Sequence, residues 1–328
     1  MALFLLRRLG AMLATMFAIS LIAFAIIELP PGDFVTSYVA ALQAQGVTIG
    51  EEELAALRAS YGLDGSVLAR YAAWIWGILS RGDFGTSFEW RQPVAELLWD
   101  RVSMSALVEL TALVLMWCVA LPIGVYSAVR RYTVGDYAAT LFGFLGLAVP
   151  NFLLALGLMY LTFRLTGSAV SGLNDAAFAD QPWSWARFVD FLGHVWAPVL
   201  VLATAGMAHL IRVLRANLLD ELNKPYVVAA RARGLTEARL VWKYPVRIAL
   251  NPLVSSIGLL LPALISSSVV VSIVMNLPTS GPLLLRALLA QDTYLAGAFV
   301  LLMGAMAIIG TVISDLLLAV VDPRVRHR

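Results

Sequence analysis

The feature that most constrains the fold of this chain is a series of long apolar runs, each of about 20 residues or more. A helix of that length covers the roughly 30 Å of hydrocarbon in a bilayer, so every run can cross a membrane with some tilt. The runs lie at Leu9–Leu29, Val102–Ala128, Tyr137–Leu165, Val195–Leu214, Ile248–Met275 and Leu295–Val321. The sequence therefore predicts an all-α membrane protein with six transmembrane helices.

Composition excludes several other classes of protein. A mean hydropathy of +0.83 with 13% charged residues leaves too little polar surface to cover a soluble globule. The single cysteine, Cys118, allows no intrachain disulfide and no cysteine pair for a metal. The only two lysines, Lys224 and Lys243, do not follow a glycine, so the chain has no phosphate-binding loop of an ATPase. We predict no catalytic, cofactor or metal site on this chain and no nucleic-acid partner.

The distribution of charge predicts the orientation in the membrane. The first run follows Arg7 and Arg8 and is longer than the apolar core of a signal peptide, which favours a retained anchor over a cleaved signal. Most of the 23 Lys and Arg residues fall on the side that holds the N-terminus, whereas most acidic residues fall on the other side. Short cytoplasmic loops are enriched in Lys and Arg, so we expect both termini to be cytoplasmic.

The runs and their orientation predict a domain organisation. Residues 1–29 form the cytoplasmic N-terminus and first helix, and residues 30–101 form a small extracytoplasmic subdomain. Residues 102–321 form a five-helix core with a cytoplasmic loop at 215–247, and residues 322–328 form a cytoplasmic tail.

The predicted subdomain contains the tryptophans Trp74, Trp76, Trp90 and Trp99. They could form a docking face for a soluble protein, or lie at the membrane–water interface as anchors. We favour the anchors, because tryptophan is enriched at that interface.

The cytoplasmic loop contains the stretch YVVAARARGLTEARLVWKYP, which has a pattern beyond its positive charge. Pro225 after Lys224 is typical of the first turn of a helix, and Gly234 is typical of a helix end. Thr236 is a good N-cap for a second helix, which Pro245 limits. The loop is therefore expected to form a short helix, a glycine turn and a helix that returns to the membrane.

The spacing of the first short helix places Tyr226, Ala229, Ala230 and Arg233 on one face. Small alanine side chains on that face would allow another surface to approach closely. The element is well placed to dock a soluble partner.

At these residues the sequence resembles a known family. AARARG, followed by a helix and a return to the membrane, resembles the EAA-type loop of ABC importer permeases, closest to the dipeptide, oligopeptide and nickel class. LPPGDF (Leu29–Phe34), YGLD with GDFGTSF (Tyr61–Phe88) and DPRVR (Asp322–Arg326) resemble other segments of that class. The combination covers nearly the whole chain and is specific, although each motif alone is weak.

The resemblance implies a function and partners. The chain would be a multi-pass subunit of a bacterial inner membrane and would form half of a translocation pathway beside a second, similar but different permease. A solute-binding protein would deliver peptides or oligosaccharide-like solutes, lipid would surround the helices, and ATP and Mg would be bound by partner ATP-binding subunits. The residues implied in coupling to those subunits are Tyr226, Ala229, Ala230, Arg233, Gly234 and Glu237.

The sequence departs from the family pattern in three places. Val228 stands where the broader motif has Glu, and Pro245 lies earlier than the proline of the motif. The segment NLPTSGPLLLRALLAQD (Asn276–Asp292) replaces the usual PGLG-like segment and resembles permeases associated with oligosaccharides as well as peptides. Both kinds of substrate therefore stay open at this stage.

The alternative function is a secondary transporter driven by an ion gradient, which would carry ionisable groups inside its spans. Glu109 in the second run is such a group, although we favour a structural or pathway-lining role for it. Prolines inside the runs favour kinks, and Pro150 with Asn151 is the strongest candidate for a kink near the pathway. Pro262 and Ser266 are further candidates for the pathway or for close helix packing.

Overall fold

The computed structural model describes residues 2–28, 34–44, 50–60, 65–178, 181–254 and 268–321. Within these ranges the regular structure is helical, and the only β contact is an isolated bridge between Thr86 and Pro93. The all-α class is confirmed for the described residues. The chain divides into unit 1, Met1–Met104 with Thr279–Ile308, and unit 2, Ser105–Pro278 with Ile309–Arg328.

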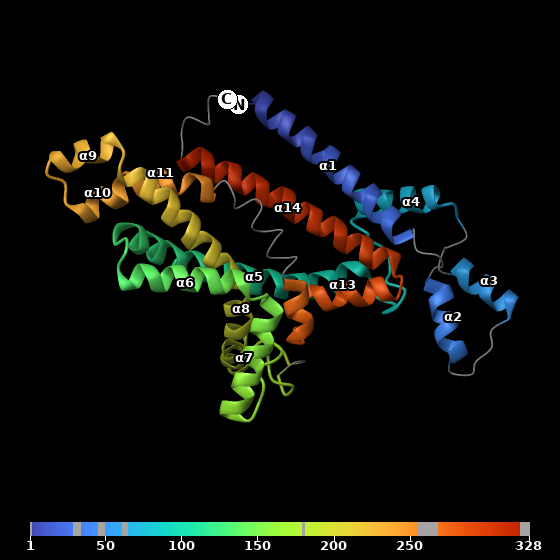
Figure 1. Cartoon of the computed structure of the whole chain (residues 1–328). Helices are drawn as coiled ribbons and strands as arrows, with labels where there is room; N and C mark the ends of the chain where they lie inside the picture. The colour runs from blue at the N-terminus through green and yellow to red at the C-terminus, as the bar shows by residue number, and fades with distance from the viewer. Residues whose placement is uncertain are drawn as a thin grey trace. The chain divides into compact units, whose positions relative to one another are not determined.

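Unit 1 contains the helices that lie before the first long span and near the end of the chain (Figure 1). They are α1 (Ala2–Glu28), α2 (Phe34–Ala44), α3 (Glu51–Ser60), α4 (Val67–Arg81), α13 (Ser280–Leu289) and the first parts of α5 (Val94–Val129) and α14 (Thr293–Val321). One buried cluster joins Phe24 of α1, Trp74 of α4, Leu98 of α5 and Phe299 of α14. The stretch 30–101 thus shares a core with α1 and α14.

Unit 2 is built around α8 (Trp185–Leu222), which packs against α6 (Val134–Ala148), α7 (Asn151–Thr166) and α11 (Pro245–Ala249). Small residues allow this close packing. A Cβ atom on Gly146 of α6 would lie 2.9 Å from the Cβ of Ala208, and one on Gly206 would lie 2.0 Å from the sulfur of Met116. Glycine at these two positions lets α6 and α5 approach α8.

Three helices in the described ranges are long and apolar enough to cross a membrane: α5, α8 and the part Thr293–Ile313 of α14. Pro122 lies inside α5 and Pro198 inside α8 without ending either helix. The first predicted run forms α1, whereas the middle of the fifth run, at 255–267, lies outside the described residues. The count of six spans therefore stays a prediction.

The third predicted run, Tyr137–Leu165, is not one continuous helix. It forms α6 and α7, which are bent by 104° at a short break. Pro150 lacks a backbone N–H and disfavours the helical conformation of the residue before it, and Val149 accordingly has φ −90° and ψ 119°. The kink predicted at Pro150 is confirmed as a full break, which leaves three or four candidate spans in the described ranges.

Candidate functional site

The candidate coupling segment, Lys224–Pro245, has the predicted helix, glycine turn and helix. Helix α9 (Pro225–Ala232) starts after Lys224, whose φ of −70° and ψ of 146° are extended. Helix α10 (Glu237–Lys243) follows Thr236 and ends before Pro245, which starts α11. The local prediction is confirmed.

Gly234 joins the two short helices in the left-handed region, with φ +80°. L-residues other than Asn and Asp rarely adopt this conformation. A Cβ atom added to Gly234 would meet nothing within 4 Å, so the backbone angle, not space, requires glycine here.

Ion pairs and hydrogen bonds hold the coupling segment in shape. The Tyr226 hydroxyl donates to Glu221 Oε2 of α8 at 2.5 Å, and burial together with this bond raises the pKa of Tyr226. Arg231 of α9 donates from Nη2 to Glu237 Oε2 of α10 at 3.1 Å and lowers the pKa of Glu237. The two short helices are therefore tied to each other and to the end of α8.

Packing decides which face of the segment is available to a partner. Val227 and Leu240 are fully buried and Ala230 is 9% exposed, so they pack against the chain itself. Val228 and Trp242 are 54% and 48% exposed. The predicted docking face contained Ala230, but the structure turns that alanine inward.

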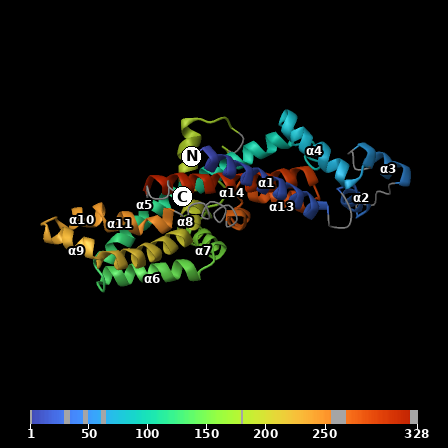
Figure 2. The same ribbon diagram turned by 90° about the horizontal axis from the view of Figure 1, so that it is seen from above.

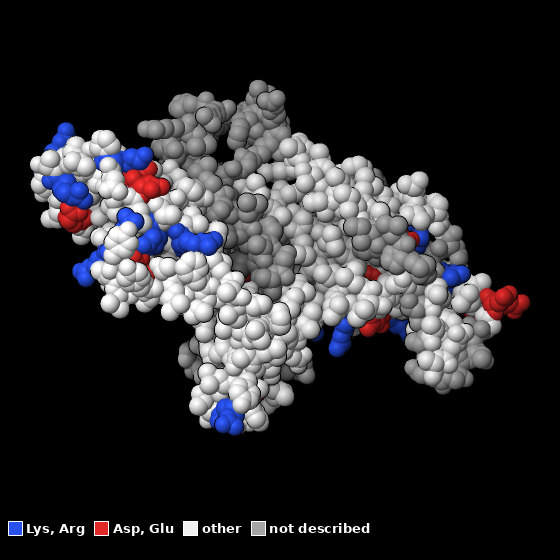
Figure 3. Space-filling model, viewed as in Figure 1, with Lys and Arg blue, Asp and Glu red and all other residues white. Residues whose placement is uncertain are grey.

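Tyr226, Ala229 and Arg233, also predicted on that face, are exposed. In Figures 1 and 2, α9 and α10 form an end of unit 2, beyond α11 and the C-terminal end of α8. Lys and Arg side chains gather over this end in Figure 3. The segment thus presents apolar and cationic side chains at the end of a long helix.

A buried ion pair lies in the same unit, where α5, α6 and α8 meet. Arg215 of α8 donates from Nε to Asp136 Oδ1 at 2.7 Å and from Nη2 to Oδ2 at 2.9 Å. The Ser127 hydroxyl and the Tyr132 backbone N–H also donate to this carboxylate. Asp136 is 2% exposed, so the network joins three helices through one buried carboxylate.

The predicted pathway residues are placed in different surroundings. Glu109 is buried, and Ser268 Oγ donates to its Oε1 at 2.7 Å, joining α5 to the helical residues 268–274. Pro150 is the N-cap of α7, and Asn151 is its half-buried first residue. Pro262 and Ser266 lie outside the described residues. A role in the pathway stays a prediction for all five candidates from the sequence.

In unit 1, Asp292 explains part of the GDFGTSF motif. Its Oδ2 accepts hydrogen bonds from Ser87 Oγ at 2.5 Å and from the backbone N–H groups of Phe88 at 2.9 Å and Glu89 at 3.3 Å. Its Oδ1 accepts the Leu295 N–H at 3.2 Å in the first turn of α14. Burial raises the pKa of Asp292 more than these hydrogen bonds lower it. The carboxyl thus fixes the motif against the start of α14.

The glycines and the aspartate of the same motif shape its backbone. Gly82 ends α4 with φ +67°, and Asp83 Oδ1 accepts the Gly85 N–H at 2.8 Å. Gly85 has φ +91°, and a Cβ atom there would lie 3.2 Å from the Tyr294 ring. The motif is therefore explained by a turn that packs closely on α14.

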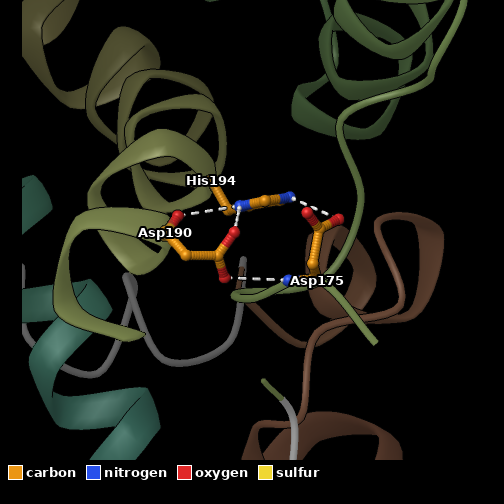
Figure 4. Close-up of side chains that lie close together, drawn as sticks. All are labelled: Asp175, Asp190 and His194. Carbon is orange, nitrogen blue, oxygen red and sulfur yellow. Dashed lines mark hydrogen bonds and ion pairs between the residues drawn. The ribbon is translucent and has the colours of Figure 1, made fainter. Parts of the chain in front are cut away.

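A third polar cluster, which lies in unit 2, joins a loop to the start of α8 (Figure 4). His194 Nδ1 lies 3.5 Å from Asp190 Oδ1, and its Nε2 lies 3.6 Å from Asp175 Oδ1. Asp190 Oδ2 also accepts the Asp175 N–H at 2.9 Å. The three side chains offer ligand atoms within 4.8 Å of one another, but the two carboxylates face opposite nitrogens of the ring. The arrangement fits a polar link between loop and helix better than one metal centre.

Sequence reasoning missed these three clusters for different reasons. Asp190 and His194 are four residues apart on a helix, so their proximity could have been predicted. Arg215 and Asp136 are 79 residues apart, and Ser87 and Asp292 are 205 apart, so no local pattern joins them.

The comparisons with known proteins identify the class. The chain matches the family described as "Binding-protein-dependent transport system inner membrane component" over residues 120–327, and the N-terminal model of such membrane components over residues 1–109. The chain belongs to this family, and it is a permease subunit of a binding-protein-dependent ABC importer in the inner membrane. Such permeases are non-catalytic membrane subunits.

Three relatives extend over nearly the whole chain. The oligopeptide transport system permease protein AppB of Bacillus subtilis is 32% identical and covers 100% of both chains. The dipeptide transport system permease protein DppB of Escherichia coli is 32% identical over 99% of both chains. A putative peptide permease protein of Brucella ovis is 31% identical over 98% of both chains. None of these names supports the alternative of an ion-driven secondary transporter.

Proposed function

We propose that this permease subunit forms half of a pathway for peptides and couples it to ATP hydrolysis on a partner. The names of the three relatives described above concern peptides, which favours peptides over oligosaccharide-like solutes. In the complete importer a second, similar permease completes the pathway, a solute-binding protein delivers the peptide, and ATP and Mg are bound by the ATP-binding subunits. The chain crosses the membrane six times, with both termini in the cytoplasm.

The observation that carries the coupling role is the helix–glycine–helix segment at the end of α8. Its inner side packs on the chain through Val227 and Leu240, whereas Val228 and Trp242 are exposed. An ordinary solvated loop would expose polar side chains at such positions. Exposed apolar side chains beside cations suit a protein groove with an acidic rim. Because Tyr226 bonds to Glu221, a displacement of α9 by the ATP-binding subunit would act directly on α8.

Two substitutions of Gly234 test the coupling role. Asn adopts the left-handed conformation with little strain, whereas a β-branched residue there is strained by about 1–2 kcal/mol or more. We expect Gly234→Asn to keep peptide uptake and Gly234→Val to lose it, with equal amounts of both variants in the membrane. Uptake of a labelled peptide and the peptide-stimulated ATPase activity of the purified importer measure the effect. Normal uptake by Gly234→Val would contradict the assignment.

A further inference from the structure

Helix α4 has apolar side chains on both of its sides. Its inner side includes Trp74 and Gly77, which are buried in unit 1. Its outer side exposes Leu68 and Leu79, each by 78%, and Trp76 by 69%. With the exposed Ala72, these residues recur every three or four positions and form one apolar stripe, which we call the outer stripe.

Contacts with α1 locate α4 along that helix. Arg70 Nη2 lies 2.6 Å from Glu28 Oε2 at the end of α1, and both side chains are largely buried. The Tyr71 hydroxyl lies 2.7 Å from Ser20 Oγ, and the Phe24 ring centroid lies 5.4 Å from that of Tyr71. Ser20 precedes Glu28 by two turns, or about 12 Å along the axis. Helix α4 therefore follows the final two turns of α1.

Most of the exposed side chains of α1 between Gly10 and Ala25 are apolar. Leu13, Phe17 and Ile22 are 64%, 58% and 59% exposed, and no charged residue interrupts the helix between Arg8 and Glu28. In an inner membrane component such side chains face lipid, since exposure to water would be unfavourable. The contacts of α4 with α1 therefore begin at Glu28, at the outer end of α1, and reach Ser20, which lies within the apolar part of that helix.

We infer that α4 lies in the outer interfacial layer of the membrane, with the outer stripe in contact with lipid. The inference rests on α1 crossing the bilayer with Glu28 at its outer end, as in the proposed function. The outer stripe has no polar residue apart from the indole N–H of Trp76, and tryptophan favours the interface. Arg81 ends the helix and is exposed, where its guanidinium can reach lipid phosphates. The stretch 30–101 is then not wholly an aqueous subdomain.

A soluble binding protein fits the outer stripe less well. Protein interfaces that dissociate have a polar rim and an average content of apolar surface, whereas this stripe is uniformly apolar. The contact of Tyr71 with Ser20 also places α4 nearer to the hydrocarbon than a soluble partner reaches. Lipid is the occupant that agrees with both observations.

Spin labels on the assembled importer in phosphatidylethanolamine and phosphatidylglycerol nanodiscs test the inference. In a Cys118→Ser background, a nitroxide is attached to a cysteine at position 68, 76 or 79 in turn. Collision rates with oxygen, which concentrates in lipid, and with a water-soluble nickel chelate are then compared. Val114, 61% exposed on α5, provides the lipid control, and the exposed Glu52 on α3 provides the water control.

We expect all three labels to collide more with oxygen than with nickel, as the label at Val114 does. Dominant nickel collisions, as at Glu52, would overturn the inference by showing water at the stripe. Exclusion of both reagents would overturn it in favour of a protein, such as the second permease. The label at position 114 reports separately whether α5 lies in the bilayer. Failure of the proposed membrane arrangement can therefore be distinguished from failure of the inference about α4.

Discussion

Removal of the Asp136 carboxylate should destabilise the protein strongly, because this one group accepts four hydrogen bonds from three elements. Breaking a buried ion pair from one side typically costs about 3–5 kcal/mol. The Arg215 side chain is 27% exposed, so water can partly solvate its charge after the change. We therefore expect Asp136→Ala to lower the free energy of unfolding by about 2–4 kcal/mol.

A double-mutant cycle isolates the ion pair from the other hydrogen bonds. The cycle compares wild type, Asp136→Asn, Arg215→Met and the double variant. Each single change leaves one member of the pair without its charged partner, whereas the double change removes both charges. We expect the free energy of unfolding of the double variant to fall by less than the sum of the two single falls. The coupling energy should be about 1–3 kcal/mol.

Denaturant unfolding in mild detergent, followed by tryptophan fluorescence, gives the four free energies. Glu237→Gln is the matched control, since it breaks the Arg231–Glu237 ion pair, whose side chains are 46% and 59% exposed. Exposed pairs contribute little, so this control should leave stability unchanged. Additive losses in the cycle, or an Asp136→Ala variant as stable as wild type, would refute the reasoning.

Two further predictions concern buried packing and a buried acid. Gly206→Val should lower the free energy of unfolding by about 1–3 kcal/mol through overlap with Met116. Met116→Ala in the same chain should recover part of the loss. Thermal unfolding of the two single variants and the double variant tests this. Burial raises the pKa of Asp292 above its usual value of 3.8, so ionisation of this acid opposes folding. The contribution of Asp292 to the free energy of unfolding should therefore fall as the pH rises above that value. Unfolding measured across that pH range should show a smaller fall for Asp292→Asn, and an equal fall in both proteins would contradict the prediction.

The sequence predicted the parts of the fold that depend on the backbone preferences of neighbouring residues. The turn at Gly234 and the helix starts at Pro225 and after Thr236 depend on backbone preferences of a few neighbouring residues. The break at Pro150 was predicted as a kink, but its angle of 104° depends on how α6 and α7 pack on α8.

Long-range contacts could not be predicted in the same way. Spacing grouped Ala230 with exposed residues because helix geometry gives the relative directions of side chains and not which direction faces the core. The partners of Asp136 and Asp292 lie on distant segments, and hydropathy contains no information about which polar residues pair inside a fold.

Contact between the coupling segment and an ATP-binding subunit is the central claim, and site-specific photocrosslinking tests it most directly. A benzophenone side chain replaces Val228, which is 54% exposed on α9, in the complete importer in native membranes. The same group at Leu165, 75% exposed at the end of α7, is the control. Our account predicts an adduct with the ATP-binding subunit from position 228 and none from position 165. An intact importer that gives no such adduct from position 228 would contradict it.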